Sequence, residues 1–283
     1  MREIRLRRYR RLRLLLENKR RMPMLGQVPL NTRKAIMEID KIYLGDCLEL
    51  MKEIPDKSID CIICDLPYGT TACAWDSIIP FDKLWAEYKR IRKPNAPILL
   101  FGSEPFSTMR RMSNLSEFRY DWIWEKSQGA NFVHAKIKPL KIHETISVFY
   151  GDTKTIYNPQ GLRPCHKVKS NSAKFGTNIR DWNHADEYVQ EWENYPTSIL
   201  RYSNPAGRER FHPTQKPVEL IRYLVRTYTN EGDLVLDNCI GSRTTAVACI
   251  KEKRHFIGME LNKEYYDIAC KRVKNELSNP TLF

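Results

Sequence analysis

Short apolar runs that alternate with amphipathic segments constrain the fold of this chain more than any other feature. Several runs are almost wholly apolar, as in strands buried on both faces of a parallel sheet. Strands are predicted at residues 39–45, 58–64, 96–102, 118–125, 144–151, 233–237 and 255–260. Helices are predicted at residues 47–54, 81–93, 217–229, 244–252 and 263–277, where apolar side chains recur at helical spacing. This alternation predicts a doubly wound α/β fold around a mostly parallel sheet.

Residues 152–211 break the alternation. They are polar, basic and aromatic, with several prolines and no clear periodicity. We interpret this segment as a module inserted into the sheet. The predicted organisation is an N-terminal arm (1–38), a first half of the core (39–151), the insertion (152–211) and a second half of the core (212–283).

Composition excludes several classes of protein. Hydrophobic residues make up 42% of the chain, which excludes wholesale disorder. No apolar run reaches the roughly 18 residues of a membrane span, so none is expected. The eight cysteines occur without a secretory signal, which predicts free thiols in a reducing compartment. No second Cys pair completes a zinc pattern, so no metal site is expected.

Positive charge is concentrated at the N-terminus. Residues 1–34 hold 12 Lys or Arg against two Glu, while the formal net charge of the whole chain is +13. A local excess of this kind favours binding to nucleic acid or to an anionic surface. The alternative is a solvated, partly helical extension.

Acidic residues follow or end four of the predicted strands. In a parallel sheet the carboxyl ends of the strands meet at one edge, where ligands bind. One such acid means little, because Asp often caps the next helix. Four of them suggest a ligand rich in hydroxyls and amines, such as a nucleoside; they are Asp46, Asp65, Asp237 and Glu260.

A tetrapeptide, Asp65-Leu66-Pro67-Tyr68, comes directly after a buried strand. An ionised Asp only accepts hydrogen bonds, and the carbonyl before a proline is a further acceptor. Tyr68 offers a flat face for stacking. Together these groups would cradle an exocyclic amino group on a planar base, although the same residues also suit an ordinary turn after a strand.

Several linked motifs resemble one family. The stretch Y-L-G-D-C-L-E-L-M-K-E-I-P-D-K-S-I-D-C-I-I-C-D-L-P-Y-G, then H-P-T-Q-K-P at 212–217, D-N-C-I-G-S-R-T-T-A-V-A and H-F-I-G-M-E-L-N-K-E-Y-Y-D-I-A occur in this order. They resemble the β class of S-adenosylmethionine (SAM)-dependent DNA amino-methyltransferases over about residues 39–150 and 212–277. The resemblance implies a Rossmann-like methyltransferase fold in circularly permuted order, with a target-recognition module at 152–211.

The resemblance also implies residue roles. Asp65 and the carbonyl of Leu66, before Pro67, would orient the target amino group, and Tyr68 would stack on a flipped base. The implied cofactor-binding residues are Asp46, Thr214, Gln215, Lys216, Asp237, Gly241, Ser242, Thr244 and Glu260. Basic residues of the insertion are candidate DNA contacts, with solvated loop charge as the alternative: Lys167, Lys169, Lys174, Arg180, Arg208 and Arg210.

Three positions depart from the family pattern. Leu66 replaces a proline but keeps the backbone carbonyl. Cys239 replaces an aromatic residue expected to pack on the cofactor's adenine. Arg243 replaces a glycine, so it would either meet the cofactor carboxylate or crowd the site, and it would demand a backbone conformation that glycine adopts easily.

The activity implied is site-specific methylation of adenine N6 in double-stranded DNA, in the cytoplasm of a bacterium or a phage-infected host. The alternatives are N4-cytosine methylation and a DNA-binding protein with an impaired SAM site. A dehydrogenase is disfavoured because G-x-G-x-x-G is absent. A homodimer is left open, and neither the recognition sequence nor a restriction endonuclease partner can be predicted.

Overall fold

The computed structural model describes residues 37–69, 76–130, 132–170, 187–205, 215–241 and 243–278. These residues all belong to one compact unit, Met37–Phe283. Residues 1–36, which make up most of the predicted N-terminal arm, lie outside the described residues. Among the described helices, none combines the length and apolar character needed to cross a membrane.

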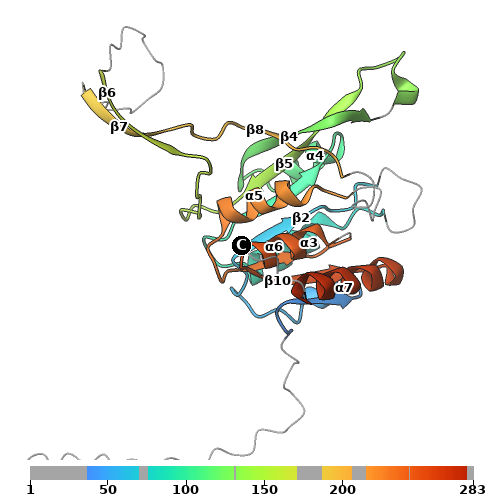
Figure 1. Ribbon diagram of the computed structural model, residues 1–283. Helices are drawn as coiled ribbons and strands as arrows, with labels where there is room; N and C mark the ends of the chain where they lie inside the picture. Colours follow the sequence, from blue (N-terminus) through green and yellow to red (C-terminus); the bar gives the residue numbers. More distant parts are fainter. Residues whose placement is uncertain are drawn as a thin grey trace, which may run out of the picture. The chain divides into compact units, whose positions relative to one another are not determined.

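An eight-stranded mixed sheet forms the centre of the unit, in the order β1-β10-β9-β2-β3-β5-β4-β8 (Figure 1). Its first five strands run parallel. They are β1 (Lys41–Leu44), β10 (His255–Glu260), β9 (Leu234–Asp237), β2 (Cys61–Cys64) and β3 (Ile98–Gly102). The prediction of a mostly parallel α/β sheet is confirmed.

The other side of the sheet carries an antiparallel hairpin. β5 (Lys141–Phe149) pairs antiparallel with β3 and with β4 (Phe118–Ala130), and β8 (Ile199–Arg201) then pairs parallel with β4. β4 and β5 are longer than the predicted strands. β8 lies inside the segment interpreted as an insertion, so the end of that segment extends the core sheet.

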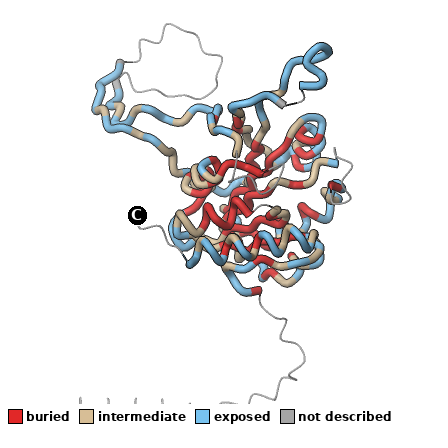
Figure 2. Tube along the Cα trace, turned by 45° about the vertical axis from the view of Figure 1, so that its right-hand side comes forward, coloured by how far each residue is buried: buried red, intermediate tan, exposed pale blue. Residues whose placement is uncertain are grey.

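Helices cover both faces of the sheet because strand residues alternate between them. One cluster of buried residues joins α5 (Val218–Tyr228), α6 (Thr244–Lys251) and α7 (Lys263–Ser278) to one face. A second cluster joins α2 (Cys47–Met51), α3 (Phe81–Ile91) and α4 (Phe106–Ser113) to the other. Figure 2 shows the buried trace concentrated in this layered core. Of these helices, only α4 was not predicted.

A switch in chain direction occurs between the neighbouring strands β2 and β9. The chain leaves β2 towards α3 on one face and leaves β9 towards α6 on the opposite face. Loops that diverge in this way leave a crevice at the carboxyl ends of the strands, where ligands bind in open α/β sheets. The sequence motifs at Asp65 and Asp237 both fall at this position.

A separate two-stranded sheet is made from β6 (Arg163–Ser170) and β7 (Glu187–Glu193), which pair antiparallel. Both strands come from the segment that breaks the sequence alternation. Exposed apolar residues on this hairpin include Val168 and Val189.

Candidate active site

A cavity of about 420 Å³ lies at the carboxyl ends of β1, β2, β9 and β10. Its volume falls in the range of about 300–1,000 Å³ that is usual for small-molecule sites. Among the described residues that line it, carboxylates far outnumber cations. Lys216 is the cation, and the acids are Asp46, Asp65, Asp76, Glu144, Asp237 and Glu260. The cavity therefore favours a positively charged ligand.

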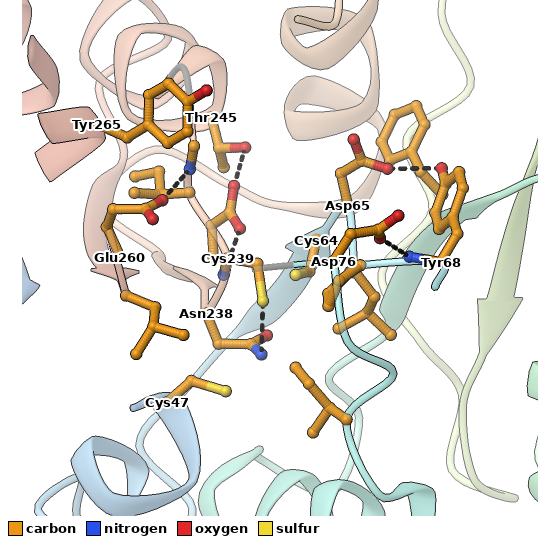
Figure 3. A pocket seen from close by; sticks show the side chains of 18 of the residues that line it. Cys47, Cys64, Asp65, Tyr68, Asp76, Asn238, Cys239, Thr245, Glu260 and Tyr265 are labelled. Atoms are coloured by element: carbon orange, nitrogen blue, oxygen red, sulfur yellow. Dashed lines mark hydrogen bonds between the residues drawn. The ribbon is translucent and has the colours of Figure 1, made fainter. Parts of the chain in front are cut away.

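Asp65 lies just beyond the end of β2, and both of its oxygens are hydrogen-bonded. The Tyr68 hydroxyl donates to Oδ1 at 2.6 Å, and Lys216 Nζ donates to Oδ2 at 2.6 Å. Figure 3 shows the Tyr68 contact beside the cavity. Lys216 is 151 residues away in the chain, so the folded sheet, and not the local turn, creates this ion pair.

Lys216 is shared between two carboxylates. Its Nζ lies 3.2 Å from Glu144 Oε2 as well as 2.6 Å from Asp65. Burial alone would lower the pKa of Lys216, but the two carboxylates outweigh it and raise that pKa. Burial would likewise raise the pKa of Glu144, yet Lys216 and Lys126 together lower it. Lys216 and Glu144 are therefore both charged at neutral pH.

Tyr68 is held on several sides. Its ring stacks on Phe106 of α4, with centroids 4.9 Å apart and planes at 25°. The Asp76 carboxylate accepts from the backbone amides of Tyr68 and Gly69, at 2.8 and 2.9 Å. Burial, and then the Asp65 carboxylate, raises the pKa of the Tyr68 hydroxyl, so it stays a donor. The tetrapeptide is thus fixed before any ligand arrives.

Asp237, the last residue of β9, is 5% exposed and lines the cavity. Its Oδ2 accepts from the Thr245 hydroxyl at 2.6 Å, and its Oδ1 accepts from the Cys239 amide at 3.2 Å. Burial raises the pKa of Asp237 to about 7 despite these donors. This carboxylate therefore lacks the compensating cation that Asp65 has.

Glu260 ends β10 and resembles Asp237 in its surroundings. The amides of Gly241 and Asn262 donate to its two oxygens at 2.9 and 2.8 Å. Burial raises the pKa of Glu260. The bond to Gly241 ties β10 to the turn that precedes α6, so the ends of the two strands form one rigid wall.

Three thiols line the same wall, from Cys47, Cys64 and Cys239 (Figure 3). Contact with Cys239, together with burial, raises the pKa of Cys47, and burial raises the pKa of Cys64 to about 12. The thiols therefore stay protonated and serve as a smooth, weakly polar lining. The Tyr88 hydroxyl fixes the intervening Asn238 through its Oδ1 at 2.5 Å.

Arg243 has the strained backbone that the sequence comparison predicted. Its φ of 62° and ψ of 26° are left-handed, a conformation that costs a non-glycine residue about 1–2 kcal/mol. The side chain is buried, and Arg243 is not among the described residues that line the cavity. Burial, and then Arg272 of α7, lowers the pKa of Arg243 to about 10. The guanidinium is thus close enough to α7 to feel the charge of Arg272, and Arg243 is absent from the described lining of the cavity.

Most of the residues predicted for the site meet at this cavity. Those that line it are Asp46, Asp65, Leu66, Pro67, Tyr68, Lys216, Asp237, Gly241, Thr244 and Glu260. Asp46 also caps α2, accepting from the Leu48 amide at 2.8 Å, so the alternative reading of that residue holds too. Gln215 is buried nearby in the chain, while Thr214 and Ser242 lie outside the described residues.

The predicted DNA-contact residues are spread over β6 and undescribed segments. Lys167 and Lys169 lie on β6, and Lys167 Nζ pairs with Glu193 Oε2 at 2.6 Å. Lys174, Arg180, Arg208 and Arg210 lie outside the described residues. Their roles stay predictions.

Sequence reasoning missed several residues of the cavity. Glu144 begins the apolar part of an antiparallel strand, whereas the acids predicted for the site all lie at the carboxyl ends of parallel strands. Its position directly before an apolar run was the available signal. Phe101, Asp76 and Tyr265 also line the cavity without a motif that marks them.

Comparisons with known proteins agree with this geometry. Residues 59–271 match the family model described as DNA methylase. The chain is 29% identical over 253 residues to the DNA adenine methyltransferase YhdJ of Escherichia coli strain K12, covering 83% of each chain. The crystal structure of the M1.HpyAVI–SAM complex superposes with a TM-score of 0.58 at 24% identity, covering 82% of this chain and 98% of that one. The PvuII cytosine-N4-specific DNA methyltransferase gives a TM-score of 0.58 at 16% identity, covering 84% and 91%.

Proposed function

The chain belongs to the DNA methylase family of N6- and N4-amino methyltransferases, and from this premise we propose that it methylates the N6 amino group of adenine at a specific DNA sequence, with SAM as the cofactor. The observation that carries the proposal is one cavity that holds both the Asp65–Tyr68 tetrapeptide and the acids of β9 and β10. We call Asp65, Tyr68, Glu144 and Lys216 the acceptor half, and Asp237, Thr244, Glu260 and Gly241 the cofactor half.

The donor groups of the cofactor half fit SAM. Asp237 is a buried carboxylate with a raised pKa and no lysine or arginine beside it among the cavity-lining residues, which suits the ammonium of the methionine end. Glu260 has carboxylate lone pairs beyond those used by Gly241 and Asn262, which suits ribose hydroxyls. When bound, SAM supplies a methyl group already activated by its sulfonium.

The acceptor half would orient the nucleophile. Asp65 and the Leu66 carbonyl accept hydrogen bonds from the target amino group, which draws its lone pair out of the ring and stabilises positive charge as it develops. Each carboxylate oxygen has two acceptor sites, so Asp65 can bind the amine while Lys216 and Tyr68 still donate to it. Lys216 and Tyr68 thus orient the Asp65 carboxylate, and both can stay bonded to it while the target amine binds.

The target base must leave the helix to reach this site, at a cost of a few kcal/mol. Stacking on an aromatic ring offsets about 1–3 kcal/mol of that cost. One face of the Tyr68 ring is covered by Phe106, so the base would use the other face. Phe106 therefore packs on the face of the Tyr68 ring opposite the one that the base would use.

Methylated-base sequencing of DNA from cells that express the protein tests the proposal. It should detect N6-methyladenine within one short sequence, and cells expressing Asp65→Ala should lack it. N4-methylcytosine at that site would instead support the second candidate, for which the fold shared with the cytosine-N4 enzyme is the favouring observation. Unmodified DNA would contradict both.

A DNA-binding protein with an impaired SAM site is favoured only by Cys239, which lines the cavity where the family pattern has an aromatic residue. Calorimetric titration with SAM separates this candidate from an active enzyme. We expect saturable binding to the purified protein. The remaining proposals are that double-stranded DNA is the substrate and that the β6–β7 hairpin belongs to a target-recognition module.

A further inference from the structure

The hairpin of β4 and β5 continues beyond the sheet on the side of the cavity. β3 ends at Gly102, which is paired with Thr145, whereas β5 begins four residues earlier at Lys141. Glu144, in that overhang, lines the cavity. Because a strand advances about 3.3 Å per residue, Lys141 lies roughly 10 Å past Glu144. The overhang, drawn in green in Figure 1, thus projects from the rim of the active site.

The end of this hairpin, which we call the extension tip (Phe132–Leu140), is apolar and wholly exposed. All nine of its residues are exposed, and the exposed fractions of Phe132, Val133 and Ile137 are 78%, 89% and 81%. Exposed apolar residues that cluster at one place often mark an interaction site, whereas single exposed apolar residues are ordinary. No other described residue covers these side chains.

The charge of the hairpin identifies the partner. Residues 126–143 contain four lysines and two histidines and no acid. Lys126 is bound to Glu144, and Lys141 to Ser103, so these two are internal. Lys136 and Lys138 are exposed beside the apolar side chains. Apolar side chains flanked by cations fit a polyanion whose interior is apolar and stacked, which is duplex DNA.

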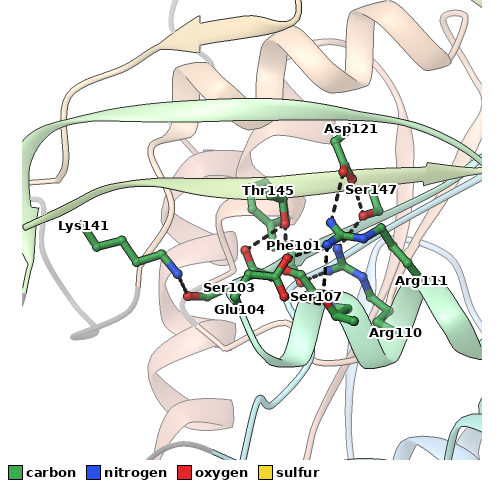
Figure 4. Close-up of polar contacts among 12 residues, drawn as sticks. Phe101, Ser103, Glu104, Ser107, Arg110, Arg111, Asp121, Lys141, Thr145 and Ser147 are labelled. Atoms are coloured by element: carbon green, nitrogen blue, oxygen red, sulfur yellow. Dashed lines mark hydrogen bonds and ion pairs between the residues drawn. The ribbon is translucent and has the colours of Figure 1, made fainter. Parts of the chain in front are cut away.

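The base of the hairpin is braced against α4 (Figure 4). Arg111 pairs with Asp121 of β4 at 3.0 Å, and Arg110 donates to Ser147 of β5 at 2.6 Å. Lys141 contacts Ser103 in the loop after β3. These contacts hold the base of the hairpin against α4, so the hairpin can keep its position when its tip contacts DNA.

We infer that the extension tip is a DNA wedge: Phe132 and Val133 enter the duplex beside the target base, while Lys136 and Lys138 contact the flanking phosphates. The inference rests on the proposed function, because a wedge serves an enzyme that flips a base. The wedge fills the space that the extruded base leaves, and so lowers the cost of flipping at a site next to the cavity that receives it.

The test compares two duplexes that carry the sequence found by methylated-base sequencing. One is fully paired, and the other has an abasic site opposite the target, which removes the cost of unpairing. The double variant Phe132→Ala/Val133→Ala should methylate the paired duplex about 30-fold more slowly, but the abasic duplex only about threefold more slowly. The control is Met112→Ala/Leu277→Ala, which removes exposed apolar side chains from α4 and α7. It should stay within about twofold of the unmodified protein on both duplexes, as should SAM affinity in every variant.

Binding measured by fluorescence anisotropy without SAM gives an answer that needs no methyl transfer. The wedge variant should bind the paired duplex about tenfold more weakly, and Lys136→Gln/Lys138→Gln should reduce the salt slope of binding by about two. Equal losses on both duplexes, unchanged binding, or a dimer that the variant converts to monomer in sedimentation would overturn the wedge. If the methylated base is N4-methylcytosine, the proposed adenine N6 activity is overturned, and the same comparison of paired and abasic duplexes around that cytosine still tests the wedge.

Discussion

The acceptor half and the cofactor half of the cavity hold their carboxylates in opposite electrostatic states. In the acceptor half Lys216 lies between Asp65 and Glu144, and the pKa of Glu144 is lowered despite burial. In the cofactor half the donors are neutral amides and a hydroxyl, and burial raises the pKa of Asp237 and of Glu260. The acceptor half carries its own cation, whereas the cofactor half would receive its cation from the ligand that we propose. The predictions below start from this difference.

Replacing Asp65 should have the largest effect. Asp65→Ala removes the carboxylate that would bind the target amine, and we expect methyl transfer to fall about 1,000-fold. SAM affinity should change by less than about threefold, because Asp65 lies in the acceptor half. Labelled-methyl transfer and calorimetry measure the two quantities. The control is Asp56→Ala, which removes an exposed acid that pairs with Arg90 and does not line the cavity.

Breaking the shared ion pair should have the next largest effect. Lys216→Met leaves Asp65 and Glu144 without their common cation, and we expect transfer to slow about 30-fold with SAM affinity nearly unchanged. Lys126→Met is the matched control, because Lys126 pairs with Glu144 but not with Asp65. It should slow transfer by no more than about threefold. Similar losses in both variants would mean that Glu144, not Asp65, is the group that matters.

Lys216→Met should also change how the free energy of unfolding depends on pH. The pKa of Glu144 is depressed in the folded protein, so Glu144 contributes stability above its unfolded pKa of about 4.5 and loses it as the pH falls through its folded pKa. Removing Lys216 raises the folded pKa and should shrink this loss. Urea unfolding at pH 7 and at pH 4 would measure a smaller difference in the variant than in the unmodified protein.

Protonation of Asp237 should weaken SAM binding by a moderate amount. Its folded pKa of about 7 lies above its usual 3.8, so in the free protein it costs stability as the pH rises through this window. In the proposed site the ionised form would pair with the ammonium of SAM, so SAM affinity should rise with pH up to about 7 and then level off, with proton release below that pH. We expect about a tenfold change per pH unit below 7. Asp237→Asn should bind SAM weakly, with an affinity that does not change with pH. A SAM affinity that still changes with pH in that variant would show that another group titrates.

Arg243 should have the smallest effect, because its side chain is not part of the cavity lining. Arg243→Gly relieves the left-handed backbone, while Arg243→Ala removes the same side chain and keeps the strain. The glycine variant should be more stable than the alanine variant by about 1–2 kcal/mol in urea unfolding. It should also bind SAM a few times more tightly than the alanine variant, since the turn at Gly241 would be better ordered. Equal values for the two variants would show that the backbone at this position is not strained.

The cofactor half could be predicted well from sequence because its parts are local. Asp237 and Glu260 each end an apolar run, and the stretch G-S-R-T-T lies directly before and at the start of α6. The left-handed conformation of Arg243 could also be anticipated, because glycine was expected there. These signals lie within a few residues of the site.

The acceptor half could be predicted only in part because its contacts cross the chain. The Asp65 tetrapeptide follows a buried strand and was recognisable, but the bond of Lys216 to Asp65 joins residues 151 positions apart. The family resemblance implied that Lys216 binds the cofactor, and the structure places its Nζ between Asp65 and Glu144. α4 and β8 were not predicted either, since α4 is short and carries few buried residues and β8 has three residues in a polar segment.

We propose that the two halves of the cavity bind different reactants, the acceptor half the target amine and the cofactor half SAM. The most direct measurement determines SAM affinity by calorimetry and single-turnover methyl transfer at saturating SAM, on Asp65→Asn and Asp237→Asn in parallel at pH 8. We predict that Asp65→Asn binds SAM normally and transfers poorly, and that Asp237→Asn binds SAM poorly but transfers at close to the normal rate once saturated. Two variants that lose affinity and transfer to the same extent would contradict the division and would show that the cavity acts as one undivided charge network.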